Sequence, residues 1–181
     1  VDHGFDASTS GWQVDHFDRV QDGVDAVAVG GKVIVSQDPG PVDLFDEAVV
    51  IDRRITLEGD GSNWPATIDG GDVDTLTLLA DGVTVRGLNL WNTTPVQETV
   101  ALRIYSRSNS IVDNTLDGSV RSATLEPGAD LNLIQGNWFR GAQNGLAIVS
   151  DRNVVEDNVF EDHTTGTIVC SGSNNTLRGN T

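Results

Sequence analysis

The chain reads IVDNTL at residues 111–116, IQGNWF at 134–139, VVEDNVF at 154–160 and LRGNT at 177–181. The segments share one pattern: an apolar residue, any residue, Gly or Asp, Asn, any residue and a second apolar residue, which the last segment stops short of. The asparagines, at 114, 137, 158 and 180, follow one another after 23, 21 and 22 residues. A period near 22 with short β-like runs and no helical spacing is typical of stacked coils. The repeat therefore predicts an all-β solenoid.

Alternation along the strands assigns each side chain a direction. Two apolar columns are expected to stack inward: Leu90, Leu116, Phe139 and Phe160 in one, and Val85, Ile111, Ile134, Val155 and Leu177 in the other. The amides of Asn114, Asn137, Asn158 and Asn180 are expected to hydrogen-bond from coil to coil at a bend, as a structural ladder. An earlier copy of the pattern, at 85–90, carries Leu88 where Asn is expected.

Charged residues align on the outward positions of the same register. Glu58 is equivalent to Arg86, Glu156 to Arg178, and Asp117, Arg140 and Glu161 form one row. Opposite charges on strands about 4.8 Å apart attract modestly. We interpret these pairs as setting the register and not as an active site.

The first part of the chain differs from the repeats. Apolar residues recur every three or four positions between Trp12 and Ala28, at Val14, Phe17, Val20, Val24 and Val27, which predicts a short amphipathic helix. We divide the chain into an N-terminal segment (1–29), whose helix caps the solenoid, and a β-helix (30–181) of about six to seven coils. Because the last repeat stops at its Asn, we expect an open strand edge there.

Composition narrows the classes of partner. The 181 residues include 27 Asp and Glu against 11 Lys and Arg, which gives a net charge of −16. Such a chain is not expected to bind nucleic acid or anionic lipid, because both need a basic face. No stretch of about 18 apolar residues occurs, so no membrane insertion is expected, and no export leader opens the sequence. Cys170 is the single cysteine, so no internal disulfide is expected.

Four further segments carry a family resemblance: GGKVIV at 30–35, IDRRITLEGDG at 51–61, ATIDGG at 66–71 and GVTVRGL at 82–88. With the Asn repeats, they resemble the single-stranded right-handed parallel β-helix of the pectate-lyase-like superfamily. The chain is most similar to NosD-type proteins and to carbohydrate-binding and sugar-hydrolase repeat proteins of halophilic archaea. Abundant Asp and a single lysine, Lys32, agree with a halophilic source. The resemblance implies a location outside the cell or at the cell surface.

Three sets of residues are candidate sites. Enzymes of this superfamily use Asp clusters, with Ca²⁺ or as acid–base pairs, and an Arg or Lys base. The resemblance therefore points to Asp69, Asp72 and Asp74 as a weak Ca²⁺ site, and Ca²⁺ is the one cofactor that it implies. The alternative is that these residues form a solvated acidic turn. The guanidinium groups of a second set could hold a uronate or a sulfate, or could balance nearby acids; its members are Arg103, Tyr105, Arg107, Arg121 and Glu126. The third set is Trp91 and Trp138, which alternation places outward as a face for sugar rings or a protein, unless a loop covers them.

Two functions fit these features. The first is a non-catalytic extracellular solenoid module with a structural, adhesive or carbohydrate-binding role. Its partners would be a polysaccharide, or a neighbouring subunit at the solenoid ends that could propagate into a filament. The alternative is a secreted polysaccharide lyase or glycoside hydrolase acting on an acidic glycan. We favour the first function, because the coils are few, the loops are short and no acid–base pair stands out.

Overall fold

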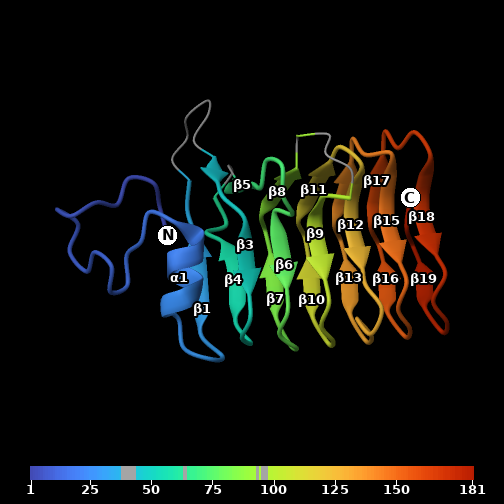
Figure 1. Cartoon of the computed structure of the whole chain (residues 1–181), viewed down its shortest axis with the longest axis horizontal. Coiled ribbons are helices and arrows are strands. Elements are labelled where there is room, and N and C mark those ends of the chain that lie inside the picture. Colours follow the sequence, from blue (N-terminus) through green and yellow to red (C-terminus); the bar gives the residue numbers. More distant parts are fainter. Residues whose placement is uncertain (38–43, 63–64, 93, 95–97) are drawn as a thin grey trace.

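A computed structural model describes residues 1–37, 44–62, 65–92, 94 and 98–181. The strands form three parallel sheets that the chain visits in turn, so that each circuit makes one coil (Figure 1). Sheet I comprises β1 (Lys32–Val35), β4 (Thr56–Gly59), β7 (Thr84–Arg86), β10 (Ser110–Val112), β13 (Leu133–Gln135), β16 (Val154–Glu156) and β19 (Thr176–Arg178). Sheet II comprises β2 (Phe45–Asp46), β5 (Thr67–Asp69), β8 (Asn89–Asn92), β11 (Thr115–Gly118), β14 (Trp138–Arg140) and β17 (Val159–Glu161). Sheet III comprises β3 (Val49–Ile51), β6 (Leu76–Leu78), β9 (Val100–Ile104), β12 (Arg121–Leu125), β15 (Asn144–Ile148) and β18 (Gly166–Cys170). The predicted parallel β-helix is therefore confirmed.

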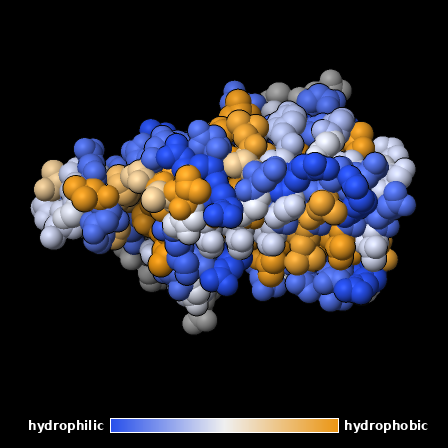
Figure 2. All heavy atoms as spheres, turned by 90° about the horizontal axis from the view of Figure 1, so that it is seen from below, coloured by the Kyte–Doolittle hydropathy of each residue, from blue (hydrophilic) through white to orange (hydrophobic). Residues whose placement is uncertain are grey.

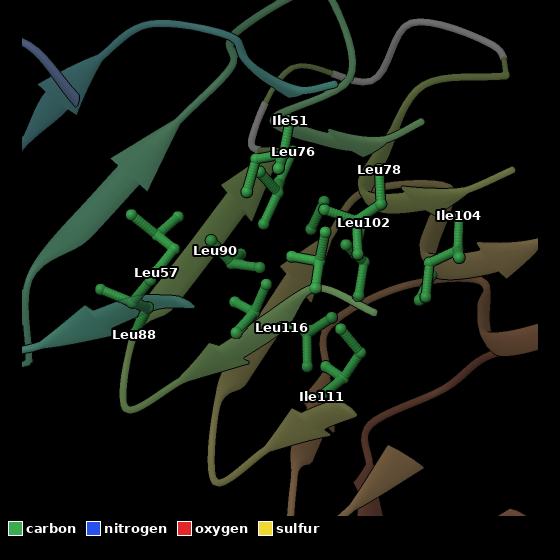
Figure 3. Packing of buried hydrophobic residues seen from close by; sticks show 14 of the residues in the cluster. Ile51, Leu57, Leu76, Leu78, Leu88, Leu90, Leu102, Ile104, Ile111 and Leu116 are labelled. Carbon is green, nitrogen blue, oxygen red and sulfur yellow. The ribbon is translucent and has the colours of Figure 1, made fainter. Parts of the chain in front are cut away.

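The two predicted apolar columns stack in register, and their members are buried except at the C-terminal end, where Phe160 is partly buried and Leu177 is 43% exposed. Leu116 pairs with Leu90 on one side and with Phe139 on the other, and Phe139 pairs with Phe160. The rings of Phe139 and Phe160 are stacked, with centroids 4.6 Å apart. Sheet III contributes a third inward column, which the Asn repeat did not mark: Leu76, Leu102, Ala123, Leu146 and Ile168. Figure 3 shows these columns meeting in one core, where each fully buried Leu or Ile contributes about 1.5–3 kcal/mol.

The predicted Asn ladder runs along the corner between sheets I and II. Asn114 donates its backbone N–H to Oδ1 of Asn137 at 3.0 Å, and Asn137 donates in the same way to Asn158 at 2.9 Å. Asn158 continues the series to Asn180 at 3.0 Å. Each side-chain amide donates to the next Asn and to a backbone carbonyl of the preceding coil. The amides thus serve backbone groups that the corner would otherwise bury without partners.

A second ladder, which the sequence analysis missed, runs along the corner between sheets III and I. Its members are Asn109, Asn132, Asn153 and Asn175, joined by backbone N–H to Oδ1 bonds of 2.8 Å each. Its intervals of 23, 21 and 22 residues equal those of the first ladder. The spacing of these asparagines could therefore have predicted the second ladder. The residues around them, however, vary more from coil to coil than those around the first ladder.

The Gly or Asp that precedes each asparagine of the first ladder has a left-handed backbone. The φ angles are 55° at Asp113, 66° at Gly136, 56° at Asp157 and 64° at Gly179. This region favours Gly and tolerates Asp, which explains the residue choice in the repeat. The carboxylates of Asp113 and Asp157 lie over the glycines of the next coils: a Cβ on Gly136 would meet Asp113 Oδ1 at 2.4 Å.

The outward charges pair as the register predicts, except that Glu161 accepts a hydrogen bond from the indole of Trp138 while Arg140 bonds Asp117. Lys32 Nζ lies 2.7 Å from Glu58 Oε1, and Arg86 bonds the other oxygen of the same carboxylate. The hydrogen bond from Lys32, followed by those from Arg86, lowers the pKa of Glu58. Glu156 bonds Arg178, and Arg140 Nε donates to Asp117 Oδ2 at 3.1 Å.

The capping helix exists but is shorter than predicted. Only α1 (Val20–Ala26) is helical, whereas residues 12–19 form turns, and Val14 is 77% exposed. The Glu47 carboxylate accepts the N–H groups of Val20 and Gln21, at 2.7 and 3.2 Å, and so fixes the start of the helix from 27 residues away. Val20 and Val24 join the core at the N-terminal end, beyond which the preceding segment forms the narrow end of the molecule (Figures 1 and 2).

Candidate functional site

The outer face of sheet II combines aromatic and charged side chains in two columns. Because Leu90, Leu116 and Phe139 point into the core, their neighbours along the strands point outward. The first column is Thr67, Asn89, Thr115, Trp138 and Val159, and the second is Asp46, Asp69, Trp91, Asp117, Arg140 and Glu161. This face therefore holds both tryptophans that alternation placed outward.

Trp138 is the most exposed aromatic side chain on this face, at 40%. Its indole Nε1 donates to Glu161 Oε2 at 3.1 Å, across one strand spacing. The guanidinium carbon of Arg140 lies 5.2 Å from the centre of the Trp138 ring, within the range of a cation–π interaction. Arg140 is held in turn by Asp117. The indole thus keeps a fixed orientation and remains accessible.

Trp91 lies in the adjacent column and is half-buried. It pairs with Asp117 on β11, and β11 pairs with β14, so two strand spacings, about 10 Å, separate it from the strand of Trp138. The expectation of two outward tryptophans thus holds more fully for Trp138 than for Trp91. Together they offer two aromatic positions in adjacent columns, placed diagonally across the face.

Sheet III carries a different part of the predicted ligand-binding set. Arg103 donates to Asp74, to Glu126 and to the carbonyl of Glu98, so its guanidinium is already occupied. Its hydrogen bonds to Asp74, and then to Glu126, raise the pKa of Arg103 above its usual value, and burial only partly opposes them. Tyr105 is 50% exposed on the same sheet. Arg103 is consequently poorly placed to hold an anionic ligand.

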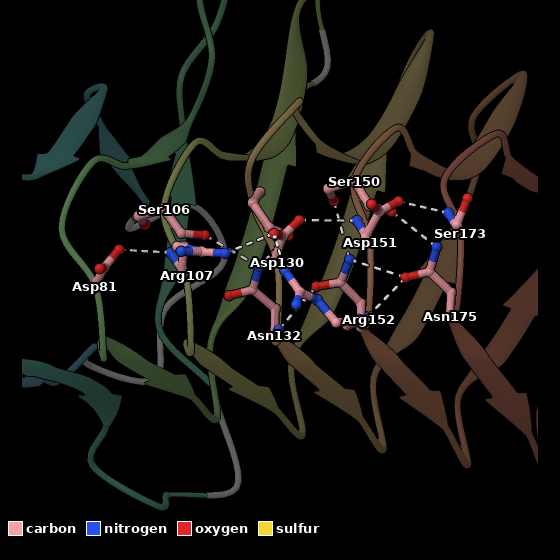
Figure 4. A network of polar contacts seen from close by, with 12 residues as sticks. Asp81, Ser106, Arg107, Asp130, Asn132, Ser150, Asp151, Arg152, Ser173 and Asn175 are labelled. Carbon is pink, nitrogen blue, oxygen red and sulfur yellow. Dashed lines mark hydrogen bonds and ion pairs between the residues drawn. The ribbon is translucent and has the colours of Figure 1, made fainter.

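Of the other two arginines of that set, Arg121 lies on sheet III beside the strand of Arg103, and Arg107 lies at a corner. Arg121 Nη1 is 3.4 Å from Glu98 Oε2 at the start of β12. Arg107 lies at the corner between sheets III and I, where it and Arg152 both bond Asp130 Oδ2, at 2.8 and 3.0 Å (Figure 4). The N–H of Asp151, and then the two arginines, lower the pKa of Asp130 from 3.8 to about 2. The structure thus keeps Arg121 beside Arg103 on sheet III and places Arg107 apart from them, and each of the three arginines has an acidic partner.

The acidic turn predicted as a weak calcium site uses its carboxylates locally. Asp69 Oδ1 accepts the N–H of Gly71 at 3.0 Å. Asp74 accepts the N–H of Val100 and is bonded to Arg103, whereas Asp72 is exposed. Within the part of the chain that the structure describes, no three His, Cys, Asp or Glu side chains converge as a metal site requires.

The imidazole and thiol donors are also dispersed. His3 stacks on Phe45 with centroids 4.0 Å apart, and His16 pairs with Asp15 at 2.8 Å. His163 directs Nδ1 to the carbonyl of Ala142 at 3.2 Å, and Cys170 is exposed on the last strand of sheet III. The sequence contains no methionine. None of these donors lies in a shared cluster among the described residues.

A family model described as periplasmic copper-binding protein (NosD) matches residues 74–181, which is more than half of the chain. The match begins just before β6 and covers all the coils that carry Asn ladders. No curated protein and no solved structure matches the chain. Among the described residues, the single helix α1, with seven residues, is too short to cross a membrane.

Proposed function

The chain belongs to the NosD family, and on that premise we propose that it is a non-catalytic solenoid module outside the cytoplasm that binds carbohydrate on the outer face of sheet II. The family description names a periplasmic protein, which agrees with the location expected from the sequence. The observation that carries the proposal is Trp138, exposed and held in place by Glu161 and Arg140.

The chemistry of this face suits a sugar chain. The flat indole ring can pack against the C–H face of a pyranose, while neighbouring carboxylates accept hydrogen bonds from hydroxyl groups. The column beside Trp138 contributes Asp117 and Glu161 as acceptors and Arg140 as a donor. Because acids outnumber bases on this face, and the whole chain carries −16, a neutral glycan is favoured over an acidic one.

Assembly at the solenoid ends remains part of the proposal as a structural or adhesive role. At the N-terminal end, α1 covers the core with Val20 and Val24. A head-to-tail contact at that end would therefore be made with the outside of the helix and not with open strands. The filament remains a prediction, as does the halophilic source.

The alternative enzyme, a lyase or hydrolase of acidic glycans, finds less support from these residues. A lyase base must lose its proton, whereas the carboxylates around Arg103 hold its guanidinium in the charged form. A hydrolase needs two free carboxyl groups on either side of the bond to be broken. Asp74 and Glu126, the acids nearest to Arg103, are both bonded to it.

Copper, which the family description names, is not part of the proposed function. Copper prefers imidazole, thiolate and thioether ligands. In this chain the three histidines lie apart, the single cysteine has no cluster around it, and methionine is absent from the sequence. The described residues therefore do not fit a copper centre.

Affinity electrophoresis in high salt tests the proposal, with xylan and a β-glucan as neutral polysaccharides and pectate as the acidic one. We expect retardation by a neutral polysaccharide and at least about a tenfold loss of affinity in Trp138→Ala, because the stacking ring is removed. Tyr105→Ala is the matched control, since Tyr105 is an exposed aromatic side chain on sheet III. Equal loss in both variants, or binding to pectate alone, would contradict the proposal.

A further inference from the structure

The outer face of sheet III carries a concentration of exposed apolar side chains. Val50 is 40% exposed, Leu79 52%, Tyr105 50%, Val149 45% and Val169 51%. Val50 and Val169 lie on β3 and β18, whereas Leu79, Tyr105 and Val149 come directly after the ends of β6, β9 and β15. Exposed apolar side chains grouped on one face, as opposed to scattered singly, mark a surface that binds another protein.

The charges on this face are recessed and paired. The side chains of Arg103 and Glu126 are 12% and 19% exposed and bond each other between β9 and β12, near the middle of the sheet. The rest of the Arg103 column consists of Val50, Thr77, Thr124, Ala147 and Val169. An approaching surface would therefore meet apolar groups on both sides of a recessed cluster in which Arg103 is bonded to Asp74 and to Glu126.

The other two sheets present charges outward. Sheet I displays Arg86 and Arg178 beside buried Glu58 and Glu156, and sheet II displays Asp117, Arg140 and Glu161. Two copies that each carry −16 repel one another wherever acidic surfaces meet. Sheet III also carries charges, but they are paired: Arg103 with Asp74 and Glu126, and Arg121 with Glu98. Two copies can therefore approach on this face with exposed apolar groups beside charges that already have partners.

From this we infer that the outer face of sheet III binds the same face of a second copy of the chain, with the two solenoids antiparallel about a twofold axis. The axis passes near the Arg103–Glu126 pair, because β9 and β12 are the middle strands of the six. Val50 of one copy then lies against Val169 of the other, and Leu79 lies against Val149, whereas Tyr105 lies against the position of Glu126. A twofold contact of this kind is self-complementary and closes, so it forms a dimer and not a fibre.

The size of the face sets the expected strength. Six strands of three to five residues, about 4.8 Å apart and with about 3.3 Å per residue, present roughly 400 Å² per copy. Two such faces bury about 800 Å² in total, which is at the low end of protein interfaces, so we expect a weak dimer that depends on protein concentration. Salt strengthens the dimer, because the Debye length falls from about 10 Å at 0.1 M to about 3 Å at 1 M and screens the repulsion between copies.

Sedimentation equilibrium of the whole chain, over roughly a hundredfold range of concentration at low and high NaCl, tests the inference. We expect a monomer–dimer equilibrium that shifts toward the dimer with salt. Val149→Asp and Val169→Asp are expected to weaken it by at least about tenfold, because each added carboxylate enters the interface twice. Val159→Asp is the matched control, since Val159 is also 45% exposed but lies on sheet II.

Circular dichroism of each variant separates lost association from lost folding. A monomer under all conditions, or a dimer that all three substitutions weaken equally, overturns the inference. The carbohydrate proposal predicts a different result for the same variants. Val149→Asp and Val169→Asp are expected to retain glycan binding, because Trp138 belongs to sheet II. Either idea can therefore fail without the other.

Discussion

The early and late coils close the same corners in two ways. In the coil of β7, the corner positions hold Val83 and Leu88, both buried apolar residues. In the following coils the same positions hold asparagines, beginning with Asn109 and Asn114. The Oδ1 atoms of these two asparagines accept the N–H groups of Val83 and Leu88, at 2.8 and 3.1 Å.

This comparison shows that the ladders have a direction. Each asparagine serves the backbone N–H of the coil before it, so a residue without an amide can stand only where a ladder begins. Leu88 meets that condition, because the preceding coil continues through the Gly59–Asp60–Gly61 segment, where the N–H of Asp60 bonds the carbonyl of Val35 instead. The departure of Leu88 from the repeat thus has a structural cause.

The strongest test places a leucine in the middle of the ladder. In Asn137→Leu, the N–H of Asn114 loses its acceptor, and the carbonyls of Ile111 and Gln135 lose a donor. We expect a loss of about 3 kcal/mol in the free energy of unfolding, since several buried polar groups lose their partners together. Chemical denaturation measures it; a loss below about 1 kcal/mol would show that the corners do not depend on the ladder.

The reverse exchange, Leu88→Asn, tests where the ladder can begin. The new amide would be buried at a position that is now 1% exposed, and its oxygen would face a coil with no matching corner N–H. We expect a loss of about 2 kcal/mol, from the lost apolar burial and an unpaired acceptor. Denaturation in the same solvent provides the measurement. If stability increases, the apolar corner is not a requirement of the early coils.

A substitution at the Gly or Asp that precedes a ladder asparagine is expected to lower the free energy of unfolding by a smaller amount. Gly136→Ala forces a side chain into a left-handed backbone and against the Asp113 carboxylate, and we expect a loss of about 1–2 kcal/mol. Gly128→Ala is the control, because its φ is also positive, 87°, but a Cβ there would meet nothing within 4 Å. Equal losses in the two variants would assign the whole effect to the backbone and none to the carboxylate.

The smallest expected effect concerns pH at the corner of the second ladder, which the early coils lack. The pKa of Asp130 falls from 3.8 to about 2 on folding, so its contribution to stability is present above about pH 4 and is lost as the pH falls toward 2. We expect Asp130→Asn to show a shallower decline of the denaturation midpoint over this range than the unsubstituted chain. An unchanged decline would mean that Asp130 does not contribute to acid sensitivity.

The sequence predicted the repeat and the first asparagine ladder, but not the second ladder or the start of the helix. The first ladder was predictable because Gly or Asp always precedes its asparagines, whereas Ser108, Leu131, Arg152 and Asn174 precede those of the second and share only a left-handed backbone. The helix was predicted too long because apolar spacing continues through Val14 and Phe17. Its actual start depends on Glu47, which the sequence places 27 residues away.

The candidate site was likewise predicted from the sequence only in part. Alternation placed Trp138 on an outer face, and it also grouped Arg103 with Arg107 and Arg121. The coils keep Arg121 beside Arg103 on sheet III but place Arg107 at a corner. Whether each arginine was free depended on acids 23 to 29 residues away, such as Asp74 and Glu126. Pairing between coils is a contact in space that a pattern of residue types does not reveal.

The sequence by itself determined the coil: its length, its inward columns and the bends that the asparagines mark, because a period near 22 and alternation along strands follow from local geometry. The tertiary structure alone decided which charges neutralise one another, where the helix begins and which face stays apolar and open. Those outcomes depend on the stacking of coils, which brings side chains more than 20 residues apart within about 5 Å of each other.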